Sequence, residues 1–163
     1  MAQGEPKMSR AFVSEAGAEA SAAILPERPV SAAPNLVTPR GLDLIDAQVA
    51  RLQALLDGCP VDDPGRAALA RGLRYWRARR GSTQLIAPAA APTEAGFGTR
   101  VTIRRGDALF TYRIVGEDEA DPPNGLLSWT SPLARSLMGA QSGDVVEVGG
   151  GRAPVRVEAV ERG

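Results

Sequence analysis

The stretch Tyr112–Val148 reads YRIVGEDEADPPNGLLSWTSPLARSLMGAQSGDVVEV and decides how the rest of the chain is interpreted. Its pattern predicts a strand, an acidic loop, a second strand, a short helix and a third strand. The helix has clear ends, because Ser131 can cap its first turn, Pro132 suits its first position and Gly139 suits its end. The inner face of this helix is predicted to carry Leu133, Leu137 and Met138.

The acidic loop lies just before the second of these strands. It places four carboxylates within five residues and is followed by two prolines, an asparagine and a glycine, which are typical turn residues. Charged side chains are costly to bury without partners, so we expect this loop to lie in solvent. Its acids are Glu117, Asp118, Glu119 and Asp121.

Three motifs in this stretch resemble the C-terminal domain of the GreA/GreB transcript cleavage factors of bacterial RNA polymerase. They are IVGEDEAD at 114–121, SPLAR at 131–135 and GDVVEV at 143–148, and the resemblance extends to FGTRVTI at 97–103 and back to about residue 35. It implies an FKBP-like domain that docks on the polymerase rim and a helical hairpin that enters the secondary channel. The polymerase-binding residues that it implies are Glu117, Asp118, Glu119, Asp121, Ser131, Pro132, Leu133 and Arg135.

Residues 34–86 predict that hairpin independently, as an antiparallel two-helix coiled coil. Thr38 before Pro39 is a typical helix start, and Gly58 with Pro60 must end the first helix. Asp63 before Pro64 predicts the start of the second helix by the same logic. Two adjacent amphipathic helices fold back on each other because neither buries its apolar stripe alone. The stripes are Leu42, Ile45, Val49, Leu52 and Leu56 in the first helix, and Leu69, Leu73 and Trp76 in the second.

The second helix is strongly basic and has no acidic residue between Pro64 and Ile86. For a generic helix this pattern favours a solvated face over a contact surface for phosphates or acidic protein. The resemblance places the hairpin close to acidic protein and RNA, and this makes the two interpretations equal. The candidate basic face consists of Arg66, Arg71, Arg74, Arg77 and Arg80.

The hairpin tip departs from the family pattern. The family relies on acidic tip residues that help to hold a second Mg²⁺ in the polymerase active site, and its Gly-Asp, Glu-Asn-Ala and aromatic signature is absent here. The tip instead carries Asp57, Asp62 and Asp63, of which Asp62 and Asp63 are the candidate Mg²⁺ ligands. Arms of about 18 residues reach only roughly 27 Å. We therefore expect these acids to serve the turn and the helix cap, without efficient transcript cleavage.

The remaining segments complete an α+β organisation. Residues 96–163 alternate in a way that predicts five short strands in an antiparallel sheet wrapped around one helix, with a turn at Arg105–Asp107 and later strands at 126–129, 144–148 and 155–160. Residues 87–95 predict a linker. Residues 1–33 have few large apolar side chains and predict a disordered tail, in which 9–13 form a short contact motif or merely tolerate a phenylalanine.

Composition excludes several kinds of chemistry. The chain has no histidine and a single cysteine, Cys59, so a catalytic triad, a zinc site and an internal disulfide are all unsupported. The formal net charge is +0. No run approaches the length of a membrane span and the start lacks a secretory pattern, so we expect a cytoplasmic protein without a membrane partner.

Three functional hypotheses follow. The first is a polymerase-binding regulator at the secondary channel without efficient cleavage, similar to the short-coil Gre relative Rnk, and the second is an active cleavage factor that rescues backtracked complexes. Under both, the protein is a monomer and not an enzyme, binds no cofactor alone beyond Mg²⁺ shared with the polymerase, and meets nucleic acid only within the transcription complex. The third is an FKBP-like peptide-binding module or prolyl isomerase, for which the available aromatics are Phe97, Phe110, Tyr112 and Trp129.

Overall fold

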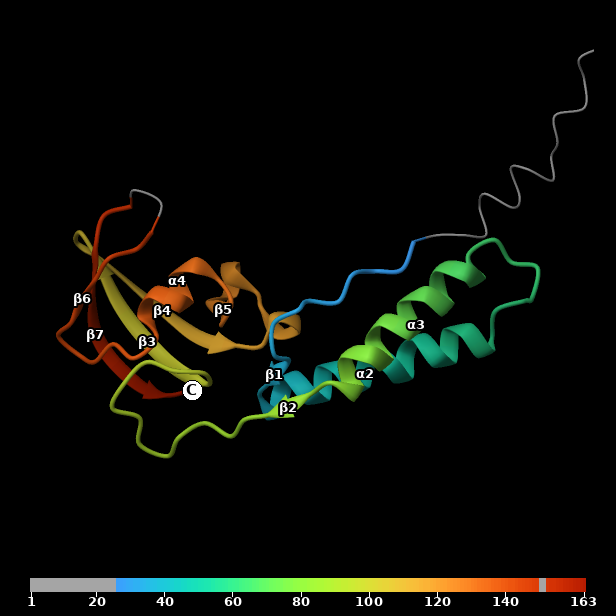
Figure 1. Cartoon of the computed structure of the whole chain (residues 1–163), viewed down its shortest axis with the longest axis horizontal. Coiled ribbons are helices and arrows are strands. Elements are labelled where there is room, and N and C mark those ends of the chain that lie inside the picture. Colours follow the sequence, from blue (N-terminus) through green and yellow to red (C-terminus); the bar gives the residue numbers. More distant parts are fainter. Residues whose placement is uncertain (1–25, 150–151) are drawn as a thin grey trace, which may run out of the picture.

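The computed structural model describes residues 26–149 and 152–163. A helical arm lies at one end of the molecule and a curled sheet at the other, joined by a short waist (Figure 1). The apolar cluster predicted at 9–13 lies outside the described residues.

The arm consists of α2 (Pro39–Asp57) and α3 (Arg66–Gly81), which run antiparallel. The predicted start of α2 is confirmed, because the Thr38 hydroxyl accepts a hydrogen bond from the Gly41 N–H at 2.9 Å. The predicted apolar stripes face each other, and their most buried members are Ile45, Leu52 and Leu73.

The predicted start of α3 at Asp63 is wrong. The helix begins at Arg66, after Gly65, and has no side-chain cap. Asp63 instead accepts a hydrogen bond from the Gly65 N–H at 2.7 Å and so folds the turn that precedes the helix. The Arg66 guanidinium then donates to the carbonyls of Leu56 and Cys59, which ties the start of α3 to the end of α2.

A two-stranded parallel ladder at the base of the arm was not predicted. Its strands are β1 (Leu36–Val37) and β2 (Gln84–Leu85). The Gln84 N–H donates to the Asn35 carbonyl at 2.8 Å, and the Ile86 N–H donates to the Val37 carbonyl at 2.9 Å. Because the chain enters the arm through β1 and leaves it through β2, this ladder fixes the two ends of the hairpin side by side.

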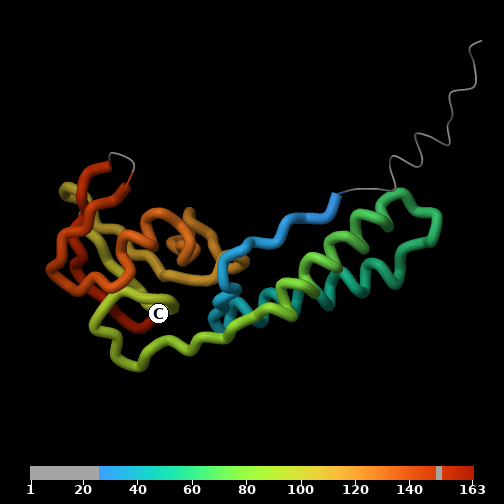
Figure 2. The backbone as a smooth tube through the Cα atoms, in the orientation of Figure 1, coloured from blue at the N-terminus to red at the C-terminus, as the bar shows by residue number. Residues whose placement is uncertain are grey.

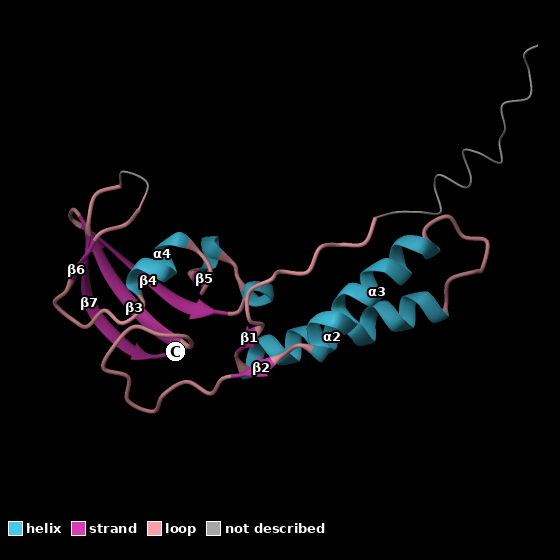
Figure 3. Cartoon of the chain, viewed as in Figure 1, coloured by secondary structure: helices cyan, strands magenta, loops and turns pink. Residues whose placement is uncertain are grey.

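The second part of the molecule is a five-stranded mixed sheet with one helix, so the predicted α+β fold class is confirmed (Figure 3). The strand order is β5-β4-β3-β7-β6. One pairing differs from the expected antiparallel sheet, since β5 runs parallel to β4. Two 3₁₀ turns between these strands, η1 (Glu117–Glu119) and η2 (Pro122–Asn124), carry the chain back to the level of Arg113, so that β5 pairs in parallel with the last three residues of β4. The strands are β3 (Thr99–Arg105), β4 (Ala108–Val115), β5 (Leu126–Ser128), β6 (Val145–Val146) and β7 (Val155–Arg162).

The helix of this part, α4 (Pro132–Leu137), starts as predicted, with the Ser131 hydroxyl accepting from the Ala134 N–H at 3.3 Å. Leu137 is fully buried, and Leu133 packs at the margin of the core. Met138 was expected on the inner face but is 42% exposed, because α4 has already ended at Leu137.

The sheet and the arm have separate apolar interiors. The core of the sheet is built from α4, the inner faces of β3, β4 and β7, and adjoining loops, and it includes no residue of α2 or α3. The apolar contacts of the arm lie along the α2–α3 seam. The junction between the two parts therefore depends on other contacts, and η1 makes them by packing against α2 and β1.

Backbone proximity at this junction gives a first prediction. A Cβ atom on Gly116 would lie 2.6 Å from the Leu36 carbonyl oxygen, so β1 and the start of η1 would have to separate. We expect Gly116→Ala to lower the free energy of unfolding by about 1–3 kcal/mol in urea denaturation. Gly96→Ala is the matched control, because no heavy atom lies within 4 Å of the added Cβ atom. Equal stability of the two variants would contradict the close approach.

Candidate functional site

The junction is organised around the buried guanidinium of Arg79 on α3, which is only 1% exposed. Its Nε donates to Asp118 of η1 at 2.5 Å, and its Nη2 donates to the Asn35 side chain at 2.6 Å. The same Nη2 lies 3.5 Å from Glu117 Oε2, close enough for charge attraction. Asn35 also donates to the Arg79 carbonyl at 2.8 Å. One side chain thus links the arm, the segment that enters it and the acidic turn.

The expectation of a fully solvated acidic loop is wrong for two of its four acids. Glu119 is 4% exposed, and one carboxylate oxygen accepts from the Thr38 hydroxyl at 2.5 Å. The other oxygen pairs with Arg40 at 3.2 Å. The Asp118 carboxylate is nearly as buried and is paired with Arg79. Both charges tolerate burial because each has a cationic partner and a hydrogen-bond donor.

Tyr75 completes the network one helical turn before Arg79. Its hydroxyl donates to Asp118 at 3.3 Å. Burial raises the pKa of Tyr75 above 10.0, and the negative charge of Asp118 raises it further, against the opposing influence of Arg28 and Arg79. The phenol is therefore held in its protonated form, which is the form that can donate to the carboxylate.

An extended segment at residues 26–31, here called the strap, lies along α3 (Figure 2). Glu27 pairs with Arg74, the Arg28 guanidinium carbon lies 3.9 Å from the centre of the Tyr75 ring, and the Ser31 hydroxyl donates to Glu117 at 3.0 Å. This part of the chain was assigned to the disordered tail at 1–33, and it differs from that expectation because its charged side chains find partners on α3 and η1.

The predicted basic face is largely engaged within the chain. Arg66 holds the turn, and Arg71 donates to the Pro26 carbonyl of the strap at 3.3 Å. The other three bond to side chains: Arg74 to Glu27, Arg77 to Gln53 and Arg80 to Asp46. The last three arginines remain exposed, so their outer edges still form a basic surface.

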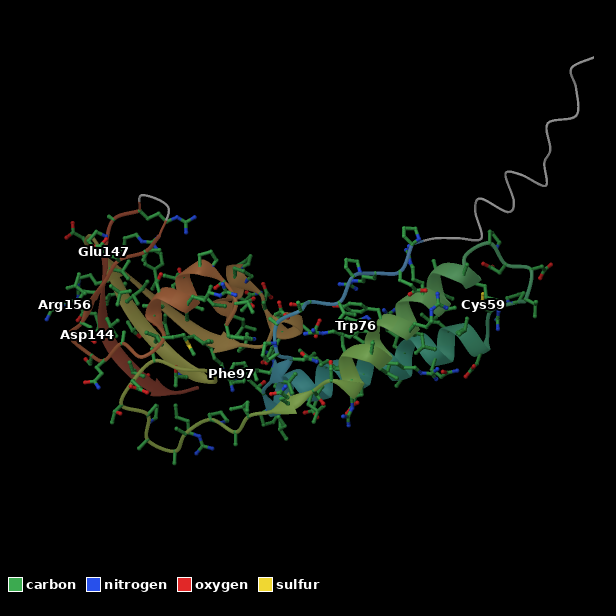
Figure 4. The ribbon with its side chains drawn as sticks, viewed as in Figure 1. Cys59, Trp76, Phe97, Asp144, Glu147 and Arg156 are labelled. Atoms are coloured by element: carbon green, nitrogen blue, oxygen red, sulfur yellow. The ribbon has the colours of Figure 1, made fainter. Side chains whose placement is uncertain are left out.

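The tip acids are exposed and do not form a cluster. Asp57 accepts from Gln53 one turn earlier at 2.6 Å, and Asp63 is used by the turn. Within residues 26–149 and 152–163, no group of three or more His, Cys, Asp or Glu side chains is placed to hold a metal ion. Figure 4 marks Cys59 at this far end of the arm and Trp76 on α3.

The residues implied for polymerase docking divide into two sets. Pro132 and Arg135 are exposed on α4, and Asp121 is half-buried and accepts from Asn124 at 2.7 Å. The others are occupied structurally, since Ser131 caps α4, Leu133 packs on the sheet core, and Asp118 and Glu119 hold the junction. Glu117 is half-buried and so is intermediate in exposure between these two sets.

Sequence reasoning did not give Arg79, Asn35 and Thr38 a role at the junction. One available signal was the spacing of Gly72, Tyr75 and Arg79 by three and four residues, which places them on one face of α3 beside the apolar stripe. An arginine on such a face needs a carboxylate partner, and the acidic turn supplies four carboxylates within five residues. Of the aromatics considered for a peptide pocket, Tyr112 and Trp129 both pack against the sheet core, and Phe110 stacks on Tyr112 along β4.

The geometry defines a two-part protein, in which a short helical arm is fixed through a polar junction to a curled mixed sheet. A family model for the C-terminal domain of the transcription elongation factors GreA/GreB matches residues 90–162. The domain formed by residues 90–162 is therefore similar to the C-terminal domain of the GreA/GreB transcription elongation factors, and this similarity covers less than half of the chain. In the described part of the chain, no helix is both long and apolar enough to cross a membrane.

Curated relatives match over a similar length of chain. The chain is 48% identical over 67 residues to transcription elongation factor GreA of Cereibacter sphaeroides, which is 40% of this chain and 43% of that protein. It is 41% identical over 70 residues to GreA of Helicobacter pylori strain 26695, which is 41% of this chain and 43% of that protein. The match thus spans less than half of the length of these relatives.

Solved structures match over more of the chain at lower identity. GreA factor homolog 1 (Gfh1) of Thermus thermophilus is 17% identical with a TM-score of 0.38, covering 79% of this chain and 99% of that chain. GreA/GreB of Nitrosomonas europaea is 21% identical with a TM-score of 0.38, covering 79% of this chain and 98% of that chain.

The buried ion pair gives a second prediction. Arg79→Met removes the guanidinium and leaves the carboxylate of Asp118 without its buried partner. We expect the free energy of unfolding to fall by about 3–5 kcal/mol in urea denaturation. Arg77→Met, two residues away on the exposed face, is the matched control and should change it by no more than about 0.5 kcal/mol. Similar losses in both variants would show that Arg79 does not hold the junction.

Proposed function

We propose that this protein binds RNA polymerase as a regulator of transcription elongation and does not stimulate efficient transcript cleavage. In this proposal the sheet docks at the rim of the secondary channel, and the short arm occupies the channel entrance, as in a short-coil variant of the family. Similarity of the C-terminal domain to that of the GreA/GreB factors supports the choice of partner. The protein supplies no reaction of its own and acts through the polymerase.

The observation that carries the non-cleaving part of the proposal is the state of the arm tip. A Mg²⁺ ion requires carboxylate oxygens at about 2.1 Å in near-octahedral geometry, so the ligands must converge. Asp57 accepts from Gln53 along α2 and Asp63 accepts from the Gly65 N–H in the turn, and in the described part of the chain these acids do not converge with Asp62 into a metal-binding group. The 19 residues of α2 span only about 28 Å, which limits how deeply the tip can reach.

The observation that supports docking through α4 is the exposure of Pro132 and Arg135 on a helix that is otherwise anchored in the core. Ala134 and Leu137 on its inner face are fully buried, so the helix presents its outer face in a fixed orientation. A rigid, exposed arginine suits pairing with carboxylates of a protein partner. This outer face of α4 does not include Asp118 or Glu119, the acids that hold the junction.

A third prediction tests docking. We expect Arg135→Glu to weaken binding to purified RNA polymerase by about ten-fold or more, because it reverses one charge at the interface. Its melting temperature should stay unchanged, since Arg135 is exposed. Arg156→Glu, an exposed substitution on β7, is the control and should bind as the unmodified protein does. Unchanged co-purification of the Arg135→Glu variant would remove α4 from the docking surface.

A fourth prediction concerns the tip and uses backtracked elongation complexes with Mg²⁺. We expect the unmodified protein to bind and affect RNA extension without efficiently shortening the transcript. The double variant Asp62→Asn/Asp63→Asn should behave in the same way, because asparagine can still accept the turn hydrogen bond from Gly65. Efficient shortening by the unmodified protein that is lost in the double variant would instead establish an active cleavage factor with these acids as metal ligands.

A further inference from the structure

A cavity of about 550 Å³ lies between the strap, α3 and η1, away from α4 and from the arm tip. Its size falls within the range of small-ligand sites, and such sites often lie where two parts of a protein meet. The residues that define its chemistry are Arg28, Ser31, Tyr75, Arg79, Glu117 and Asp118.

One wall of this cavity is aromatic and already carries a cation. The Arg28 guanidinium carbon lies 3.9 Å from the centre of the Tyr75 ring and 5.9 Å from that of Trp76. Trp76 does not line the cavity but packs nearly perpendicular to Tyr75, with ring centres 5.3 Å apart, so its indole lies next to the aromatic wall. The negative face of an aromatic ring attracts cations, and a flat guanidinium can also stack on it.

A second wall of the cavity is acidic, and one of its carboxylate oxygens accepts no hydrogen bond in the described structure. The Asp118 carboxylate is bonded to Arg79 and Tyr75, and Glu117 Oε1 accepts from Ser31. Glu117 Oε2 is buried and accepts no hydrogen bond in the described structure. Two carboxylates face the single buried guanidinium of Arg79, so the site without Arg28 keeps a negative charge.

We propose that the Tyr75 face of this cavity is a recognition site for an arginine side chain, occupied by Arg28 of the same chain and open to an arginine of a polypeptide partner. Arg28 stacks on Tyr75 but makes no hydrogen bond to Glu117 Oε2, so an incoming arginine that stacks on the same ring gains by donating to this oxygen. Lysine fits less well, because a compact ammonium does not stack and is more strongly hydrated.

Arg28 is an exchangeable occupant. Besides this contact, the strap is held by the pair between Arg74 and Glu27, whose side chains are 57% and 61% exposed, and by two hydrogen bonds, from Arg71 to the Pro26 carbonyl and from Ser31 to Glu117. Exposed ion pairs are weak, so a partner that supplies a better-placed arginine displaces the strap by mass action. Displacement also uncovers Arg71 and Arg74, which contact Pro26 and Glu27 in the strapped state.

The experiment uses the full chain with Arg28→Ala, which empties the site without altering α3 or η1. The probe is N-acetyl-arginine amide, and the readout is the NMR signal of the Trp76 indole N–H, assigned by comparison with a Trp129→Phe variant. We expect a saturable shift in the Arg28→Ala chain. The unmodified chain should bind about ten-fold more weakly, because tethered Arg28 competes at an effective concentration of about millimolar.

Three controls make the outcome decisive. The citrulline analogue, which is neutral, should give no saturable shift, and the lysine analogue, which has the same charge, should bind at least about three-fold more weakly. Adding Glu117→Gln to Arg28→Ala should weaken arginine binding, with folding checked by the dispersion of the remaining signals. Equal shifts with arginine and lysine, or no saturable shift in the Arg28→Ala chain, would overturn the proposal. Polymerase is absent throughout, so either result leaves the proposed docking untouched.

Discussion

The buried guanidinium of Arg79 is the constraint on which the arrangement of this molecule depends. A guanidinium removed from water must be matched by an opposite charge and by acceptors, and only Asp118, Glu117 and Asn35 supply these here. They come from the turn after β4 and from the segment before α2. Since the arm and the sheet share no apolar core, matching this one charge sets where the arm is attached to the sheet.

A second buried acid fixes the direction of α2. The Thr38 hydroxyl accepts from the Gly41 N–H and donates to Glu119, so the group that caps the helix is also the group that holds the acidic turn. A Cβ atom on Gly41 would lie 2.9 Å from Glu119 Oε2, which shows how closely the first turn of α2 approaches the carboxylate. The sequence of the acidic motif predicts a solvent-facing loop, but two of its acids instead connect the sheet to the helical arm.

Features set by neighbouring residues were predictable from the sequence. The caps at Thr38 and Ser131, the apolar stripes of α2 and α3 and the β3–β4 hairpin all follow from spacings of a few residues. Features set by residues far apart in the sequence were not predictable in this way. Arg77 and Arg79 lie on the same helix, yet Arg77 is exposed and Arg79 is buried. Arg79 is buried because it pairs with Asp118, which is 39 residues away in the sequence and therefore not visible in the local pattern. The β1–β2 ladder and the parallel β4–β5 pairing also join segments whose local sequence does not specify each other.

The site was less predictable than the fold for a related physical reason. An acidic residue in a turn can serve as a docking contact, a cap or a buried ion, and composition does not distinguish these roles. Asp118 and Asp121 stand in the same motif, but only Asp118 lies within reach of an arginine from the arm. The presence of a family motif therefore indicates a domain more securely than it indicates the role of each acid within it.

The two ends of the arm are constrained very differently, and this bears on how function can vary within the fold. At the base, each charged group has a partner in another element, so a substitution there disturbs the attachment of the arm. At the tip, the turn is held by local bonds from Arg66 and to Asp63, and within residues 26–149 and 152–163 its exposed acids bond only to groups of the arm. Because the tip makes no contact with the junction, its residues can change without altering how the arm is attached to the sheet. The sheet and its attached arm can therefore stay the same while the chemistry of the tip residues varies independently.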